Sequence, residues 1–370
     1  MVGIDSTFPN EARLCAFLSD YLSGVGMKVE TQKVEDGRFN IFAQKGAGEA
    51  HVLFLGHIDT VPAAAGWSSD PCKIRREGDK LHGLGCFDMK GGISSAIKSI
   101  EETAGSVKLL LCIDEENISK GAWKAVKDRR EWFEGISLVV SPEPILDNGM
   151  SAKSENIITL GSGGRVVIEV DVHGRSAHQA RSEEGINAIE EMAKIISNIS
   201  KMELRKHDKL GKEEIFVRMV EGASKGLSVP EDARFEMDMR LVPPSSANDA
   251  VGRLHSLVEE LKNKGVLNER AEVDVKVKAR ETPYLEPYLT DIKNREVAKV
   301  LEVLGSHYGS YAVSYDRSVS DENVIANSLK VPVMRIGPKG SGAHSKDEWV
   351  SYGSVRDLAK LYAEIIERID

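Results

Sequence analysis

The chain has 370 residues, of which 41% are hydrophobic and 29% are charged, and these fractions are ordinary for globular domains. The composition excludes a disordered, collagenous or low-complexity protein, and the length predicts roughly two or three domains. A formal net charge of −9 lacks the basic footprint of a nucleic-acid binder or of a surface that anionic lipid attracts, so we expect neither partner.

Three further features bear on where the protein works. The longest apolar run, 107–113 with Lys108 inside it, falls far short of the ~20 residues that a membrane span needs. The first residues show no basic stretch followed by an apolar one, so we expect no secretory signal. The four cysteines show no CxxC spacing, which argues against a disulfide framework or a zinc finger. We therefore expect a cytoplasmic protein.

The first 160 residues combine short apolar runs with amphipathic stretches. Continuous apolar runs at 52–55, 109–113 and 137–140 predict strands that are buried on both faces. Between the first two strands, residues 93–103 place their apolar side chains on one helical face. This succession predicts an α/β domain with a largely parallel sheet.

The pattern changes near residue 162, where apolar and charged residues begin to alternate, as they do in strands with one polar face. The elements predicted there are a strand at 166–173, a helix at 186–196, strands near 214–221 and at 235–241, a helix at 251–261 and a strand near 271–279. The order β-α-β-β-α-β is that of a ferredoxin-like α+β unit.

After residue 280 the α/β pattern returns. The elements predicted there are a helix at 293–304, a strand at 331–336 and a helix at 354–368. The simplest account is one α/β domain, formed by residues 1–161 and 280–370, which a smaller α+β domain at 162–279 interrupts.

Polar clusters follow the predicted strands of the α/β domain. They are Gly56-His57-Ile58-Asp59, Asp114-Glu115-Glu116, Ser141-Pro142-Glu143-Pro144, the loop that ends at Ala343-His344-Ser345, and residues 83–92 around Asp88. In an open α/β sheet, ligands bind outside the carboxyl ends of the strands, so we expect these clusters to converge. Two histidines and several carboxylates suit zinc or a similar divalent metal, and without a cation they would repel one another or stay unpaired.

Each cluster by itself has an ordinary structural explanation. A histidine after a strand is more often a hydrogen-bonded structural residue than a ligand, and Glu115-Glu116 alone is typical of a solvated loop. Gly83-Leu84-Gly85 suggests a dinucleotide-binding fingerprint, but the third glycine would fall at Asp88 and no strand leads directly into the motif. We exclude that interpretation, and only the convergence of the clusters favours a metal site.

Six segments together carry a specific resemblance. They are Gly56-His57-Ile58-Asp59-Thr60-Val61-Pro62, Gly83 to Gly92, Asp114-Glu115-Glu116, Pro142-Glu143-Pro144, Gly174-Arg175-Ser176-Ala177-His178 and Gly342-Ala343-His344-Ser345-Lys346-Asp347-Glu348. The chain resembles the M20 family of metallopeptidases and amidohydrolases, especially its acetylornithine deacetylase and succinyl-diaminopimelate desuccinylase branch. The resemblance covers nearly the whole chain. It implies a zinc-peptidase-like catalytic domain with an inserted lid or dimerisation domain.

The resemblance implies a site with two Zn²⁺ ions, for which Co²⁺ can substitute. Asp88 would bridge the two metals, and a cis peptide would follow it. One metal would be completed by His57 and Glu143, and the other by Glu116 and His344. Asp59 would not touch metal but would hold His57 in the correct tautomer. Glu115 would be the general base that takes a proton from the metal-bridging water.

The resemblance also gives the inserted domain a role. In the family this domain forms a homodimer interface, through which a histidine reaches the partner's active site. His178 matches that histidine and would stabilise the oxyanion, although by itself it is typical of a turn residue. Arg240 matches an arginine that grips the substrate carboxylate, although a surface ion pair explains it equally well. Ser228 stands where the family often has Asn, which puts one contact to the substrate or to the partner subunit in doubt.

The function that the resemblance implies is hydrolysis of the amide bond of an N-acyl amino acid, of the N-acetylornithine or N-succinyl-diaminopimelate type. Glu143 favours this activity, since family aminopeptidases tend to have Asp there, and Arg240 agrees with it. One alternative is a carboxypeptidase or dipeptidase of the same family, which acts on short peptides. The other is a metal-binding relative without catalysis. The family usually has a helix before residues 4–11, and we expect this chain to begin at the end of that helix.

Overall fold

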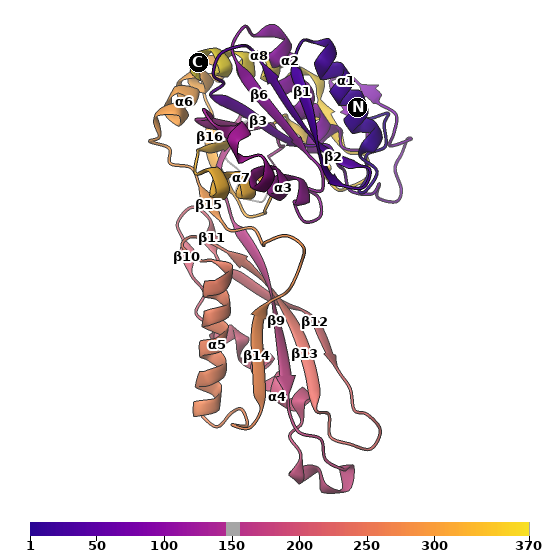
Figure 1. Cartoon of the computed structure of the whole chain (residues 1–370), viewed down its shortest axis with the longest axis vertical. Helices are drawn as coiled ribbons and strands as arrows, with labels where there is room; N and C mark the ends of the chain where they lie inside the picture. Colours follow the sequence, from indigo (N-terminus) through magenta and orange to yellow (C-terminus); the bar gives the residue numbers. More distant parts are fainter. Residues whose placement is uncertain (146–155, 370) are drawn as a thin grey trace. The chain divides into compact units, whose positions relative to one another are not determined.

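The computed structural model describes residues 1–145 and 156–369, and the chain divides into two compact units (Figure 1). Unit 1 comprises Met1–Ser162, Tyr288–Asp316 and Ser320–Asp370, and unit 2 comprises Gly163–Pro287 and Arg317–Val319. The second division thus lies after residue 287 rather than after 279. The reason is that Leu285 pairs with Arg165 and Tyr284 packs against the apolar core of unit 2.

A nine-stranded mixed sheet forms the centre of unit 1. Its strands are β1 (Lys28–Glu35), β2 (Arg38–Lys45), β3 (Val52–His57), β6 (Val107–Cys112), β7 (Leu138–Ser141), β8 (Ile157–Ser162), β15 (Tyr288–Leu289), β16 (Ala312–Asp316) and β17 (Val333–Arg335). The order is β1-β2-β6-β3-β7-β17-β8-β15, and β16 pairs with β8. The central strands β6, β3, β7 and β17 run parallel, which confirms the predicted α/β class, whereas β1, β2 and β15 pair antiparallel with their neighbours.

Helices cover both faces of this sheet, which is why its central strands are mostly apolar on both faces. On one face, α1 (Ala12–Gly24), α2 (Gly91–Glu102), α6 (Arg295–Tyr308) and α8 (Tyr352–Ile369) share one apolar cluster with the strands. On the other face, α3 (Lys120–Asp128) and α7 (Asp321–Leu329) contact each other (Figure 1). The helices predicted at 93–103, 293–304 and 354–368 are thus confirmed. Within 1–145 and 156–369, no helix is both long and apolar enough to span a bilayer.

A small second sheet in unit 1 brings two distant segments together. It is formed by β18 (Gly340–Ser341), β19 (Trp349–Ser351), β5 (Lys80–His82) and β4 (Arg75–Glu77), in the order β18-β19-β5-β4. The pairing of β19 with β5 places the segment that follows His344 beside the segment that precedes Asp88.

Unit 2 has the predicted β-α-β-β-α-β order, with one short hairpin after its first helix that was not predicted. Its elements are β9 (Gly164–His173), α4 (Ala188–Asn198), the short hairpin β10 (Lys206–His207) and β11 (Gly211–Lys212), β12 (Glu214–Gly222), β13 (Asp232–Leu241), α5 (Ala247–Asn263) and β14 (Glu272–Val277). The antiparallel sheet has the order β12-β13-β9-β14. Both helices share one apolar cluster with alternate residues of β9 and β13. The alternation in the sequence therefore reflects one face under helices and one charged face.

Candidate metal centre

His57 ends the buried strand β3 and is itself only 2% exposed. Its Nδ1 lies 3.0 Å from the backbone carbonyl of Asp59 and 3.6 Å from Asp59 Oδ1. A carbonyl can only accept, so Nδ1 carries the proton and donates it. Nε2 faces Asp88 Oδ1, 3.3 Å away, and Glu143 Oε2, 3.6 Å away.

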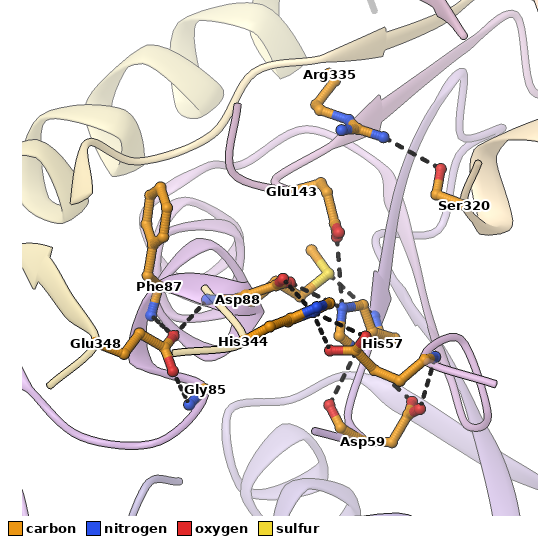
Figure 2. Close-up of polar contacts among 12 residues, drawn as sticks. His57, Asp59, Gly85, Phe87, Asp88, Glu143, Ser320, Arg335, His344 and Glu348 are labelled. Carbon is orange, nitrogen blue, oxygen red and sulfur yellow. Dashed lines mark hydrogen bonds and ion pairs between the residues drawn. The ribbon is translucent and has the colours of Figure 1, made fainter. Parts of the chain in front are cut away.

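Asp88 lies in the turn Cys86–Lys90, between β5 and α2, and is 6% exposed. The cis peptide that the resemblance implies is present between Asp88 and Met89. While Oδ1 faces His57, Oδ2 lies 3.2 Å from Nε2 of His344. The two carboxylate oxygens of Asp88 therefore face two different histidines (Figure 2).

Two sets of donors meet at Asp88. The ligand atoms of His57, Asp88 and Glu143 lie within 4.8 Å of one another, and so do those of Asp88, Glu116 and His344. In the second set, Nε2 of His344 lies 3.0 Å from Glu116 Oε2. Because Asp88 belongs to both sets with a different oxygen facing each histidine, the arrangement suits two adjacent cations that share one carboxylate.

Glu115 lies beside both donor sets. Its carboxylate comes within 4.8 Å of the ligand atoms of His57 and Glu116, so geometry alone also allows it as a ligand. Burial and the negative charges of Glu143, Glu116 and Asp321 raise the pKa of Glu115 well above its ordinary value, against the effect of His57. A carboxylate with raised proton affinity in this position is suited to accept a proton.

The backbone around Glu143 depends on a close approach of another loop. A Cβ atom on Gly337 would lie 1.9 Å from the carbonyl oxygen of Glu143, so only glycine fits there. Gly337 follows β17, which pairs parallel with β7, the strand that leads to Glu143. This pairing places Glu143 at the carboxyl end of the sheet, where His57 also lies.

Asp59 holds its neighbours through both its backbone and its side chain. The backbone carbonyl oxygen lies nearer to Nδ1 of His57 than the carboxylate does, whereas the family resemblance implies that the carboxylate holds this histidine. The carboxylate instead accepts a hydrogen bond from the backbone N–H of Glu116, at 3.0 Å from Oδ2. Asp59 thus connects the loop after β3 to the loop that carries Glu115 and Glu116.

Sequence reasoning missed two buried arginines that support the loops. Arg38 is buried and binds Glu11 through Nε at 2.9 Å and Asp114, next to Glu115, through Nη2 at 3.1 Å. Arg335 is also buried, with Glu322 Oε1 2.8 Å from its Nε, and in Figure 2 it lies near Glu143. Each lies within a strand or at a strand end, and a charged residue amid buried apolar strands was the signal that could have revealed them.

His178 and Arg240 both belong to unit 2. His178 is exposed, and its Nδ1 accepts a hydrogen bond from the backbone N–H of Ala180 at 3.1 Å. The neutral ring therefore carries its proton on Nε2. Arg240, on β13, donates from Nη1 to the carbonyl of Leu210 at 3.1 Å and from Nη2 to the carbonyl of Lys212. Its guanidinium is thus partly engaged by the β10–β11 hairpin, and its Nε lies 3.5 Å from Glu214 Oε2, an ion pair of the kind that the alternative interpretation names.

The donor set can be tested for its fit to metal by its own electrostatics. Burial lowers the pKa of His57, but Glu143, Asp59 and Asp88 outweigh that effect and hold it well above its ordinary value. Burial and the charge of Asp88 raise the pKa of Glu143 to about 7, and hydrogen bonds to Asp88 and Glu116 raise the pKa of His344 to about 10. Without metal, the cluster thus holds protons on the side chains from which a divalent cation would displace them. Oxygen and imidazole donors in these numbers fit zinc or a similar ion.

The affinity of the chain for divalent metal is expected to fall as the pH falls. With a pKa of about 10, His344 is protonated from pH 6 to pH 8 in the metal-free protein, so binding at His344 releases a proton throughout this range. The metal affinity at the position of His344 should therefore fall about tenfold for each unit by which the pH is lowered. Glu143 adds a similar dependence only below its pKa of about 7. Metal titration in competition with a chelator at pH 6, 7 and 8 checks this expectation, and a pH-independent affinity would contradict it.

Comparisons with known proteins point to one family. The family model described as peptidase family M20/M25/M40 matches residues 53–368. Among curated relatives, the chain is 26% identical to succinyl-diaminopimelate desuccinylase of Zymomonas mobilis subsp. mobilis, over 99% of this chain and 96% of the relative. It is also 26% identical to acetylornithine deacetylase of Proteus mirabilis, over 97% of this chain and 90% of the relative.

Solved structures show the same fold. Aminopeptidase PepT from Bacillus cereus superimposes with a TM-score of 0.78 at 18% identity, over 100% of this chain and 95% of the other. The family match extends from β3 into α8 and includes the segments with His57, Asp88, Glu116, Glu143 and His344. The chain therefore belongs to peptidase family M20/M25/M40, a family of metal-dependent peptidases and amidohydrolases.

Proposed function

We propose that this protein hydrolyses the amide bond of an N-acyl amino acid, with Glu115 as the general base. The observation that carries the proposal is the placement of Asp88, whose two carboxylate oxygens face His57 and His344 separately while Glu115 lies beside both donor sets. The curated relatives named succinyl-diaminopimelate desuccinylase and acetylornithine deacetylase support an acyl group on an amino acid as the substrate class.

Two zinc ions, or cobalt ions in their place, would be held at this site. His57 and Glu143 would complete one position, Glu116 and His344 the other, and Asp88 would contribute to both. Bound cations there supply positive charge that polarises the scissile carbonyl and acidifies water. The hydrogen bond from Nδ1 of His57 to the carbonyl of Asp59 leaves Nε2 as the nitrogen that binds metal. This is the usual function of a hydrogen bond to the other ring nitrogen of a ligating histidine.

The side chains would divide the proton transfers and charge stabilisation among them. Glu115 would accept a proton from the attacking water and return it to the leaving amine nitrogen. His178 would donate from Nε2 to the oxygen that gains negative charge, since Ala180 already occupies Nδ1. Arg240 would bind the substrate carboxylate with the donor capacity that Leu210 and Lys212 leave free.

We propose a homodimer that forms through the inserted domain. Strand β12 is at the edge of the unit 2 sheet, and its Phe216 and Val220 are 61% and 56% exposed. Exposed large apolar side chains on an edge strand favour pairing with another chain. His178 is exposed and therefore free to reach a partner.

Hydrolysis of a small substrate panel tests the proposed function. The panel contains N-acetylornithine, N-succinyl-diaminopimelate, N-acetyl-lysine and two dipeptides, each assayed with added zinc or cobalt and with a chelator. We expect turnover of at least one N-acyl amino acid, its loss with the chelator and its return when metal is restored. Turnover of dipeptides alone would make the protein a dipeptidase. No turnover with two metals bound would favour the non-catalytic relative.

A further inference from the structure

One buried carboxylate binds the turn that carries Asp88. Glu348 precedes β19 and is 2% exposed. Its Oε1 accepts the backbone N–H groups of Phe87 at 2.8 Å and Asp88 at 2.9 Å, and its Oε2 accepts that of Gly85 at 2.7 Å (Figure 2). Three main-chain donors from one short segment thus converge on a single side chain.

The turn needs such an acceptor because of its backbone conformation. Gly85 has φ +70°, in the left-handed region, and the following residues form no strand ladder in which their N–H groups could pair. Buried N–H groups without acceptors are costly, so a carboxylate at this point stabilises one particular shape of the turn. That shape determines where the carboxylate of Asp88 lies.

Glu348 also belongs to the loop that carries the second histidine. His344 lies four residues earlier, and the loop between them is tight, with positive φ at His344 and Asp347 and a hydrogen bond from the N–H of Ser345 to the carbonyl of Gly342. The backbone carbonyl of Glu348 accepts the N–H of Gly83 at 3.2 Å, which joins the two segments a second time. The loop of His344 and the turn of Asp88 are therefore held together at Glu348.

We infer that Glu348 is a positioning residue for the metal position formed by Asp88, Glu116 and His344. It belongs to neither donor set, and acts by holding His344 Nε2 and Asp88 Oδ2 at 3.2 Å. The position formed by His57, Asp88 and Glu143 depends less on it, because there Glu348 acts only on Asp88. His57 and Glu143 follow β3 and β7 of the large sheet. The inference rests on the proposed metal centre and adds to it a residue that sets one of the two affinities.

Metal titration of Glu348→Gln tests the inference. Glutamine has the same shape but replaces one acceptor oxygen by an NH₂ group that faces a backbone donor. The metal-free variant is titrated with Co²⁺ and followed by calorimetry and by visible absorption, which reports ligand geometry. We expect two ions to bind the wild type, and in the variant one of the two affinities to fall by about 10–100-fold while the other changes little. The absorption of the weakened site should also shift.

The matched control is Glu213→Gln in unit 2. Glu213 is likewise buried and accepts the backbone N–H of Arg205 at 2.8 Å, but it lies outside the metal-binding unit. This variant should bind both ions as the wild type does, even if its melting temperature falls. If Glu348→Gln folds poorly, Glu348→Asp, which keeps the charge on a shorter side chain, gives the same comparison and should retain more affinity at the affected position.

The outcomes separate the inference from the proposed function. If the wild type binds two ions and Glu348→Gln binds both with unchanged affinity, the positioning role is overturned while the metal centre stands. The same holds if the variant loses affinity equally at both positions. A wild type that binds fewer than two ions would overturn the proposed centre and the inference with it. Selective weakening of one position, absent in Glu213→Gln, supports both.

Discussion

Replacement of Glu115 by glutamine is expected to lower kcat by about 10²–10⁴-fold, the contribution typical of a general base. The amide has the size of the carboxylate but cannot accept the proton of the attacking water. Burial and the surrounding carboxylates raise the pKa of Glu115 well above its ordinary value, which increases its proton affinity for this step. Steady-state kinetics on the best substrate of the panel, with metal content measured on the same sample, checks the prediction.

The metal content decides between the two roles that the geometry allows for Glu115. As a base, Glu115→Gln should still bind two ions. The matched control is Glu116→Gln, in the adjacent residue, which should weaken the position shared with His344, 3.0 Å away. If Glu115→Gln loses an ion and Glu116→Gln does not, the assignments of base and ligand are exchanged, since Glu115 also lies within ligand distance of His57.

Replacement of His178 by alanine is expected to lower kcat by about 10²–10³-fold with little change in KM, as removal of one oxyanion donor does elsewhere. The reason is that an oxyanion exists mainly in the transition state, so its donor contributes little to substrate binding. Nδ1 of His178 accepts a hydrogen bond from the backbone N–H of Ala180, so the proton on Nε2 is the one that can be donated to the oxyanion. Kinetics of His178→Ala beside His173→Ala, a histidine on β9 that pairs with Asp232, checks the effect. An unchanged kcat would make His178 an ordinary turn residue.

Mixed dimers test whether His178 acts in the partner subunit. Glu115→Gln and His178→Ala, each nearly inactive, are coexpressed with different tags and the mixed species is purified. If His178 acts across the interface, one site of the mixed dimer contains both Glu115 and His178, and about half of the wild-type activity per dimer should return. If it acts within its own subunit, no site is complete and no activity returns.

The sequence predicted most of the elements that position the site, because their patterns are local. The continuous apolar runs of β3, β6 and β7 and the alternation in β9 and β13 follow directly from burial on two faces or on one. It missed the β1–β2 hairpin, although Asp36-Gly37 between alternating residues is a recognisable turn signal. The antiparallel edges of the large sheet also escaped prediction, since strand direction depends on partners far along the chain.

The sequence by itself determined the fold class, the order of the domains and which donor side chains follow which strands. Only the tertiary structure decided how those donors pair: Asp88 divides its oxygens between two histidines, Asp59 holds His57 by its carbonyl, and Glu348 binds the turn of Asp88 from 260 residues away. The physical reason is one of scale. Hydrophobic periodicity is read over a few residues, whereas a hydrogen bond of 2.9 Å between distant loops exists only once the sheet and its turns are in place.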